Sequence, residues 1–116
     1  MGDTHLVSGI VRILEPPKEK FINQSISVTT FRVQFPQVRQ NYLVHLKVWG
    51  NLARDVANYY KMNDYILIEG YISTREIDSS QLDRQSQKRK KVEITILKVY
   101  PFLLSYDQYS KPLKSY

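Results

Sequence analysis

Apolar and polar residues alternate with a period of two over much of this chain, and that period most constrains its fold. Within residues 25–35, Phe31, Val33 and Phe35 fall on one side, with polar residues between them. Such alternation is typical of β-strands that bury one face. Prolines, which lack the backbone donor of a strand ladder, end the first two stretches. We predict strands at residues 5–14, 25–35, 42–49, 65–77 and 92–102.

One segment, residues 51–61, changes to the period of a helix. Leu52 and Val56 stand at positions i and i+4 on one helical face, and Asn51 is a suitable N-cap. Just beyond this segment, Asn63 can adopt the left-handed conformation that ends helices.

The predicted order is three strands, one helix and two strands. A short helix between the third and fourth strands of a five-stranded sheet is typical of the OB-fold, a small Greek-key barrel. We therefore predict an all-β chain with an OB-fold, the alternative being an open α+β sheet. The 116 residues suffice for one domain, which we place at residues 1–104. Residues 105–116 have few aliphatic side chains, and we expect a flexible C-terminal tail there.

Charge and composition narrow the range of functions. Seventeen Lys and Arg against eleven Asp and Glu give a formal charge of +6, which favours a polyanionic partner. The chain has two histidines and no cysteine, and its four glycines form no phosphate-binding loop. We therefore expect no catalysis, cofactor, metal site or small-molecule substrate. No apolar run approaches the roughly 18 residues of a membrane span, so we expect no membrane partner.

Trp49 is the most informative single residue. It shares its predicted strand face with His45 and Lys47, opposite the apolar positions of the same strand. An exposed aromatic ring beside cations suits single-stranded nucleic acid, since bases stack on the ring and phosphates contact the cations. The alternative is a tryptophan that covers a hydrophobic rim or a subunit contact.

Neighbouring predicted strands carry cations at outward positions, namely Arg32, Lys47 and Arg75. If these strands adjoin as in an OB barrel, the cations lie across one face together with Trp49 and Tyr71. Such a face suits a nucleic-acid backbone. Arg and Lys are also common on solvated strands without any ligand, and that alternative stays open.

A basic run lies in the predicted loop at residues 78–91. Its cations are Arg84, Lys88, Arg89, Lys90 and Lys91, with no acidic residue among them. The loop joins the fourth and fifth strands, where OB-folds grip oligonucleotides. The alternatives are a solvated loop or contact with anionic lipid, although no amphipathic helix accompanies the run.

Residues 49–61, WGNLARDVANYYK, and residues 65–70, YILIEG, resemble the signature of bacterial and organellar single-stranded DNA-binding proteins. The resemblance extends more loosely over about residues 5–102. It implies that Trp49 stacks a base, that Arg75 fills a basic position, and that the long loop embraces DNA.

Some positions depart from the pattern of that family. Leu43 and Ile77 stand where further aromatics are common, although Tyr42 could replace the first of them. The C-terminal sequence KPLKSY is basic, whereas bacterial members carry an acidic tail. We therefore expect fewer stacking rings than usual and no recruitment of repair or replication enzymes through such a tail.

The resemblance implies a non-enzymatic module that binds single-stranded DNA with little sequence preference in replication and repair. The alternatives are an OB module for RNA or tRNA, and a primosome-like module that docks a protein. The family also implies a homo-oligomer, either a tetramer or a dimer. The short chain without a leader-like start resembles homologues encoded in algal plastids, which predicts the plastid stroma or, alternatively, a bacterial cytoplasm.

Overall fold

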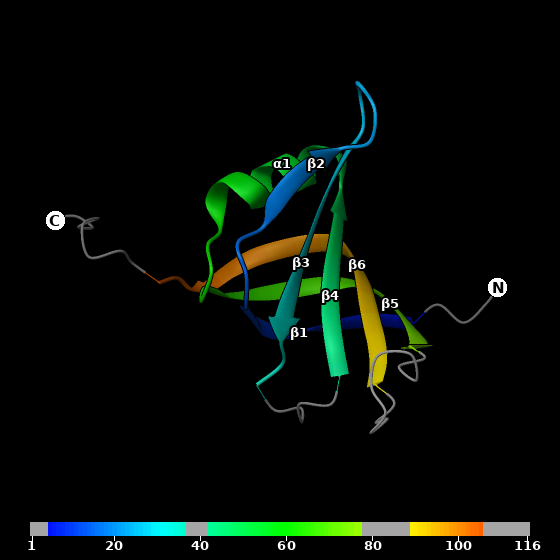
Figure 1. Cartoon of the computed structure of the whole chain (residues 1–116). Helices are drawn as coiled ribbons and strands as arrows, with labels where there is room; N and C mark the ends of the chain where they lie inside the picture. Colours follow the sequence, from blue (N-terminus) through cyan, green and yellow to red (C-terminus); the bar gives the residue numbers. More distant parts are fainter. Residues whose placement is uncertain (1–4, 37–41, 78–88, 106–116) are drawn as a thin grey trace, which may run out of the picture.

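The computed structural model describes residues 5–36, 42–77 and 89–105 of the chain. Within these residues it has six strands and one helix (Figure 1). The elements are β1 (His5–Ile13), β2 (Lys18–Phe21), β3 (Ser27–Gln34), β4 (Tyr42–Trp49), α1 (Gly50–Tyr59), β5 (Tyr65–Ile77) and β6 (Arg89–Leu103).

Five of the strands close into a barrel. Their hydrogen-bonded order is β1, β5, β6, β4, β3, and the end of β1 pairs again with β3, at Arg12 with Gln34 and Ile13 with Val33. Strands β4 and β6 run parallel, and the other pairs run antiparallel. This closed ring, with its helix between β4 and β5, confirms the predicted OB-fold.

The short strand β2 is an addition that the sequence pattern did not predict. After Pro16 and Pro17 interrupt the first strand, the chain returns to the sheet and pairs β2 with the start of β3. Between the two pairings, the Glu15 carboxylate accepts the backbone N–H of Arg32 at 2.9 Å. One edge of β3 is therefore shared by β1, β2 and a side chain.

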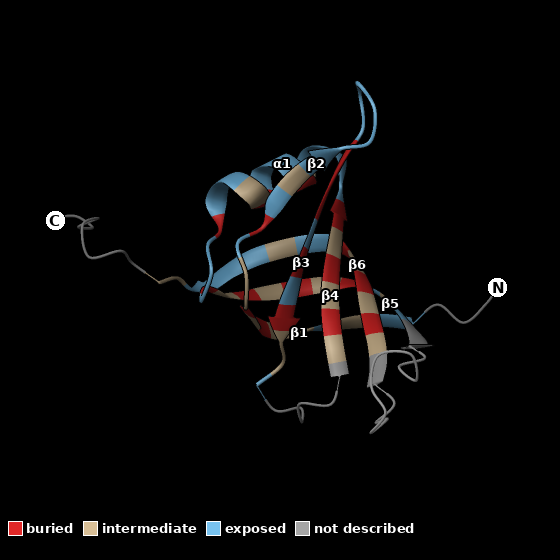
Figure 2. Cartoon of the chain, viewed as in Figure 1, coloured by how far each residue is buried: buried red, intermediate tan, exposed pale blue. Residues whose placement is uncertain are grey.

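The inward residues of the barrel strands form one apolar core (Figure 2). Its strand members are Val11, Ile13, Phe31, Val33, Val44, Leu46, Val48, Ile66, Ile68, Val92, Ile94 and Ile96. The predicted alternation is thus confirmed for the barrel strands.

Helix α1 covers one end of the barrel (Figure 1) and buries Ala53 and Val56. The hydroxyl of Thr29, fully buried on β3, donates a hydrogen bond of 2.9 Å to the carbonyl of Ala53. This bond satisfies a buried polar pair and ties the helix to the sheet.

The helix begins one residue earlier than predicted. Gly50 is its first residue and has a φ of 71°, a conformation that glycine adopts without steric cost. Trp49 takes the cap position without a side-chain hydrogen bond, so the prediction of Asn51 as N-cap is wrong.

The buried carboxylate of Asp64 joins the end of the helix to the end of β6. It accepts the backbone N–H of Lys61 at 2.8 Å and that of Ser105 at 2.7 Å. The Asp64 carbonyl also accepts the N–H of Ile13 on β1. Asn63 has the predicted left-handed conformation, with a φ of 76°.

The hairpin of β5 and β6 is longer than predicted. Pairing continues to Ile77 opposite Arg89, so residues 89–91 belong to a strand and not to a loop as predicted. Residues 78–88 and 106–116 lie outside the described part of the chain, so the predictions of a basic loop and a flexible tail stay predictions there.

Gly70 marks one of the two register irregularities of this hairpin, and it is the one that the sequence position of the glycine predicts. The register shifts between Glu69 and Gly70, as at a β-bulge. A Cβ built on Gly70 would overlap the carbonyl oxygen of Thr95 in the neighbouring strand. A side chain at this position would therefore push the two strands apart.

We expect Gly70→Ala to lower the free energy of unfolding by about 1–3 kcal/mol, because the added methyl group overpacks a backbone contact. Gly9→Ala is the matched control, since its Cβ meets only the movable ring of Phe35. Urea unfolding of both variants measures the difference. An equal decrease in the two variants would contradict the packing role of Gly70.

Candidate nucleic-acid interface

Trp49 lies at the rim of the barrel, where β4 turns into α1. The residue is 45 % exposed. The Nζ of Lys47, on the same face of β4, lies 5.7 Å from the centre of the indole ring, within cation–π range. An exposed ring and a cation therefore stand side by side.

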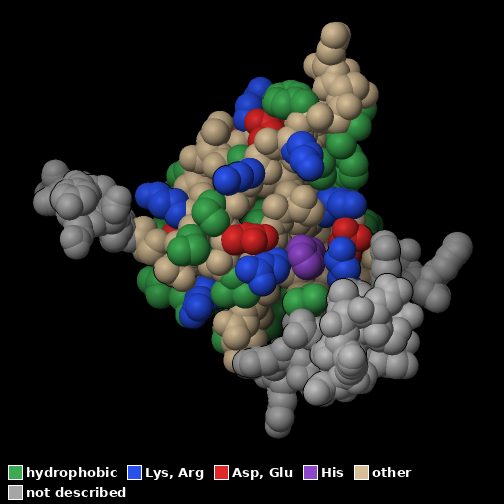
Figure 3. All heavy atoms as spheres, in the orientation of Figure 1, with side chains coloured by type: hydrophobic (Ala, Val, Ile, Leu, Met, Phe, Trp, Pro, Cys, Tyr) green, Lys and Arg blue, Asp and Glu red, His purple; other side chains and the backbone are tan. Residues whose placement is uncertain are grey.

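Two cations of this face are each paired with a carboxylate. The Nζ of Lys47 lies 3.2 Å from Oε2 of Glu93, and Nε of Arg32 lies 3.3 Å from Oε1 of Glu15. The Arg32–Glu15 pair is exposed, whereas the side chains of Lys47 and Glu93 are half-buried. Surface ion pairs contribute about 0–1 kcal/mol to stability. They orient the two cations more than they stabilise the fold. In Figure 3, acidic side chains likewise lie beside several of the basic ones.

The backbone register aligns Lys47 with Tyr71. Lys47 on β4 is opposite Thr95 on β6, which is opposite Tyr71 on β5. Aligned residues of neighbouring strands project on the same face, and two strand spacings separate Tyr71 from Lys47, roughly 10 Å. Tyr71 is 43 % exposed. A second aromatic ring thus stands on the face that carries Trp49 and Lys47.

His45 lies in the adjacent row, opposite Arg32 on one side and Glu93 on the other. Burial lowers its pKa, as do the charges of Lys91 and Arg32, and the carboxylates of Glu15 and Glu93 only partly offset this. Nδ1 is buried and has no hydrogen-bond partner among the described residues. His45, predicted on the surface, is half-buried, and its lowered pKa favours the neutral imidazole.

Residues from the predicted basic run meet other candidate residues at one end of the sheet. Lys91 is opposite Arg75 on β5 and Leu43 on β4, and Lys90 is opposite Tyr42. These are backbone positions, and Lys91 itself is half-buried.

The rest of the predicted run is only partly described. Arg89 is the first residue of β6, opposite Ile77. Arg84 and Lys88 lie outside the described residues. Their contribution to the interface stays a prediction.

The sequence pattern missed two lysines on this face, Lys18 and Lys20 of β2. Lys18 is opposite Thr30, which is opposite Lys47, and Lys20 lies in the row of Trp49. The alternation in KEKF is the only signal that could have found them.

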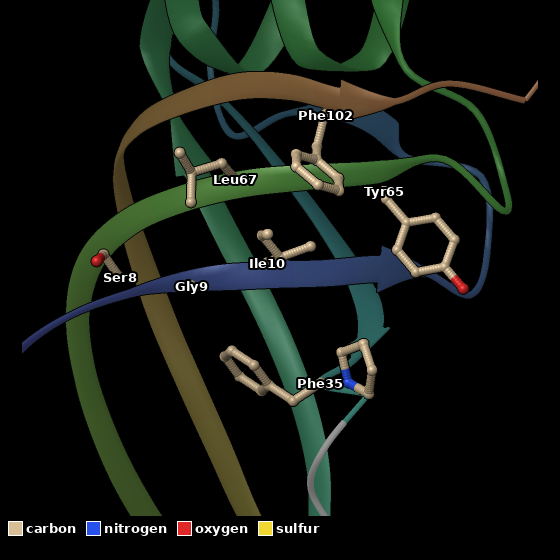
Figure 4. A pocket seen from close by; sticks show the side chains of 8 residues that line it. Ser8, Gly9, Ile10, Phe35, Tyr65, Leu67 and Phe102 are labelled. Atoms are coloured by element: carbon tan, nitrogen blue, oxygen red, sulfur yellow. The ribbon is translucent and has the colours of Figure 1, made fainter.

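A different side of the barrel is apolar. An open pocket of about 560 Å³ lies among Ser8, Gly9, Ile10, Phe35, Pro36, Tyr65, Leu67 and Phe102 (Figure 4). Phe102 and Leu6 are 60 % and 65 % exposed. Leu6 on β1 is opposite Tyr71 on β5, so the apolar surface adjoins the polar face that carries the aromatics.

Other kinds of site find little support in the described residues. They contain no group of three or more His, Asp or Glu side chains placed to hold a metal ion. Their helix is not long and apolar enough to cross a membrane.

Comparison with known proteins places this geometry in a family. The sequence profile of the Single-strand binding protein family matches residues 6–102. A putative single-stranded DNA-binding protein, ycf41 of Trieres chinensis, is 38 % identical over 108 residues, covering 90 % of this chain and 94 % of the relative.

Solved structures share the fold at low sequence identity. The crystal structure of the SSB domain of a Synechococcus sp. protein matches with a TM-score of 0.64 at 19 % identity, covering 86 % of this chain and 98 % of that one. A small single-stranded DNA-binding protein of Streptomyces coelicolor matches with a TM-score of 0.62 at 12 % identity, covering 88 % and 97 %. By its sequence and its fold, the chain belongs to the single-strand binding protein family.

Proposed function

We propose that this protein binds single-stranded DNA, without enzymatic activity and with little sequence preference. The observation that carries the proposal is the exposed ring of Trp49 beside the Lys47 ammonium on an open sheet face. Every base has a π-face, so stacking on such a ring tolerates any sequence. The names of the relatives, which describe single-stranded DNA-binding proteins, support the same function.

In the proposed mechanism, the strand of DNA crosses the face with bases on Trp49 and Tyr71. Its phosphates contact Lys47, Arg32 and the basic run that ends at Lys91. A phosphate that approaches Lys47 or Arg32 competes with the carboxylate that already holds it. Binding therefore exchanges one ion pair for another, and its free energy depends strongly on salt.

We propose that the apolar face joins copies of the chain into a homo-oligomer, either a dimer or a tetramer. In the described residues, β1 pairs with β3 only at Arg12 and Ile13, so one edge of its first half carries no strand. Leu6 on β1 is exposed, and the exposed Phe102 of β6 lines the pocket beside Gly9 and Ile10 of β1. An open edge beside an apolar surface is a site for strand pairing between copies.

We propose the plastid stroma as the place of work, and DNA replication and repair as the process. The resemblance to homologues encoded in algal plastids and the match to ycf41 of Trieres chinensis support a plastid. Recovery of the protein in another compartment, or in a bacterial cytoplasm, would contradict this location.

RNA binding is the competing function, and titration with structured RNA distinguishes it from binding of single-stranded DNA.

We expect Trp49→Ala to weaken binding to labelled oligo(dT) by about 1–3 kcal/mol, because one stacked base loses its platform. Fluorescence anisotropy of the labelled strand measures this without the tryptophan signal. Tyr59→Ala, which removes an exposed ring from α1, is the control and should leave the affinity unchanged. Equal curves for the unchanged chain and Trp49→Ala would refute stacking, and tighter capture of structured RNA by the unchanged chain would favour the RNA alternative.

Replacement of Lys88, Arg89, Lys90 and Lys91 by Gln should flatten the dependence of log affinity on log salt. For a single strand, the slope falls by about 0.7 for each phosphate that the protein no longer neutralises. Titrations with oligo(dT) at several salt concentrations measure the slope. An unchanged slope would show that the basic run does not bind DNA.

We expect Leu6→Asp to shift the protein from an oligomer to a monomer, because a charge enters the apolar contact beside the free edge of β1. Analytical ultracentrifugation measures the mass. Met62→Asp places the same charge at another exposed apolar position, beyond α1, and should leave the oligomer intact. A monomeric unchanged chain would contradict the proposed assembly.

A further inference from the structure

Strand β2 extends the sheet beyond the barrel, next to the face that carries Trp49. It pairs with β3 alone and forms the edge of the sheet. The turn to β3 is held by Asn23, whose Oδ1 accepts the backbone N–H groups of Ser25 at 2.8 Å and Ile26 at 3.0 Å. β2 is therefore held in place by a ladder on one side and by a hydrogen-bonded turn at its end.

The register brings both lysines of β2 onto the Trp49 face. Lys18 is opposite Thr30, and Thr30 is opposite Lys47. Because aligned positions share a face, Lys18 lies two strand spacings, roughly 10 Å, from the backbone of Lys47.

Lys20 is opposite Val28, and Val28 is opposite Trp49, so the backbones of Lys20 and Trp49 are also two strand spacings apart. Glu19, between the two lysines in sequence, is opposite the buried Thr29 and so points to the other face. Two exposed cations thus adjoin the stacking ring with no acid between them on that face.

Lys18 and Lys20 differ from Arg32 and Lys47 in whether a carboxylate already occupies the cation. Arg32 and Lys47 each have a carboxylate partner. Among the described residues, no carboxylate lies within ion-pair distance of Lys18 or Lys20. A phosphate reaches these two ammonium groups without displacing an acid.

We propose that β2 is the phosphate-binding edge of the interface, with Lys18 and Lys20 holding the backbone of nucleotides adjacent to the base on Trp49. This inference rests on the proposed binding of single-stranded DNA. It assigns to β2 a larger share of the salt-dependent affinity than to Arg32, whose charge Glu15 already neutralises.

The test compares double variants that remove the same charge. In one, Lys18→Gln and Lys20→Gln are combined. In the control, Lys61→Gln and Lys98→Gln are combined. Both lysines are exposed: Lys61 follows α1, and Lys98 lies on β6 opposite Glu69. Arg32→Gln is the third variant. Affinity for labelled oligo(dT) is measured by anisotropy at several salt concentrations, with thermal unfolding as the check on folding.

The β2 variant should bind on the order of tenfold more weakly at low salt, and the slope of log affinity against log salt should fall by about 1.4, as expected when two phosphates are no longer neutralised. The Lys61→Gln, Lys98→Gln control and Arg32→Gln should show smaller decreases in the affinity and in the salt slope. A β2 variant that binds as well as the control would overturn the inference while the unchanged chain still binds. Failure of the unchanged chain to bind oligo(dT) would overturn the proposed function, and this inference with it.

Discussion

The pairing of the end of β1 with the end of β3 closes the sheet, and the two faces of the molecule depend on that closure. Two residue pairs make the closing contact, Arg12 with Gln34 and Ile13 with Val33, and the N–H of Leu14 adds a bond to the carbonyl of Arg32. Once the ring is closed, the inward side chains of the five barrel strands meet in one core. The outward side chains need no packing partner, so they are free to carry rings and charges for a ligand. Pro16 and Pro17 come shortly after the two closing pairs and end the pairing of β1, so the chain that follows them can form β2.

Two cations of the outer face, Arg32 and Lys47, are paired with carboxylates before any ligand arrives. Glu15 and Glu93 hold the side chains of Arg32 and Lys47 at positions on the sheet, with little effect on stability. In the proposed mechanism a strand of DNA competes for these cations, whereas base stacking on Trp49 is expected to add about 1–3 kcal/mol without such competition. Stacking and the lysines of β2, which have no carboxylate partner in the described part of the chain, are thus expected to supply most of the net affinity, with the paired cations directing the path of the backbone.

Much of the barrel could be predicted from the sequence, because the inward and outward positions of a half-buried strand carry apolar and polar residues in alternation. The bulge at Gly70 and the left-handed Asn63 were predicted from residue type, and the exposed side of Trp49 from its alternation with Val48. Strand β2 could not be predicted in this way, since KEKF is short and charged and becomes a strand only through its pairing with β3. The carboxylate partners of Arg32 and Lys47 also come from distant parts of the chain, and no local pattern indicates them.

The two ion pairs have a consequence for how this protein can evolve. Glu15 and Glu93 lie outside the apolar core, so an exchange of either one alters the charge of the face, and an exchange of Glu15 also removes the acceptor of the Arg32 backbone N–H. Selection can therefore tighten or relax the retention of a nucleic acid in single-residue steps. Adaptation to a cell with a different ionic strength would need no change in the interior of the fold.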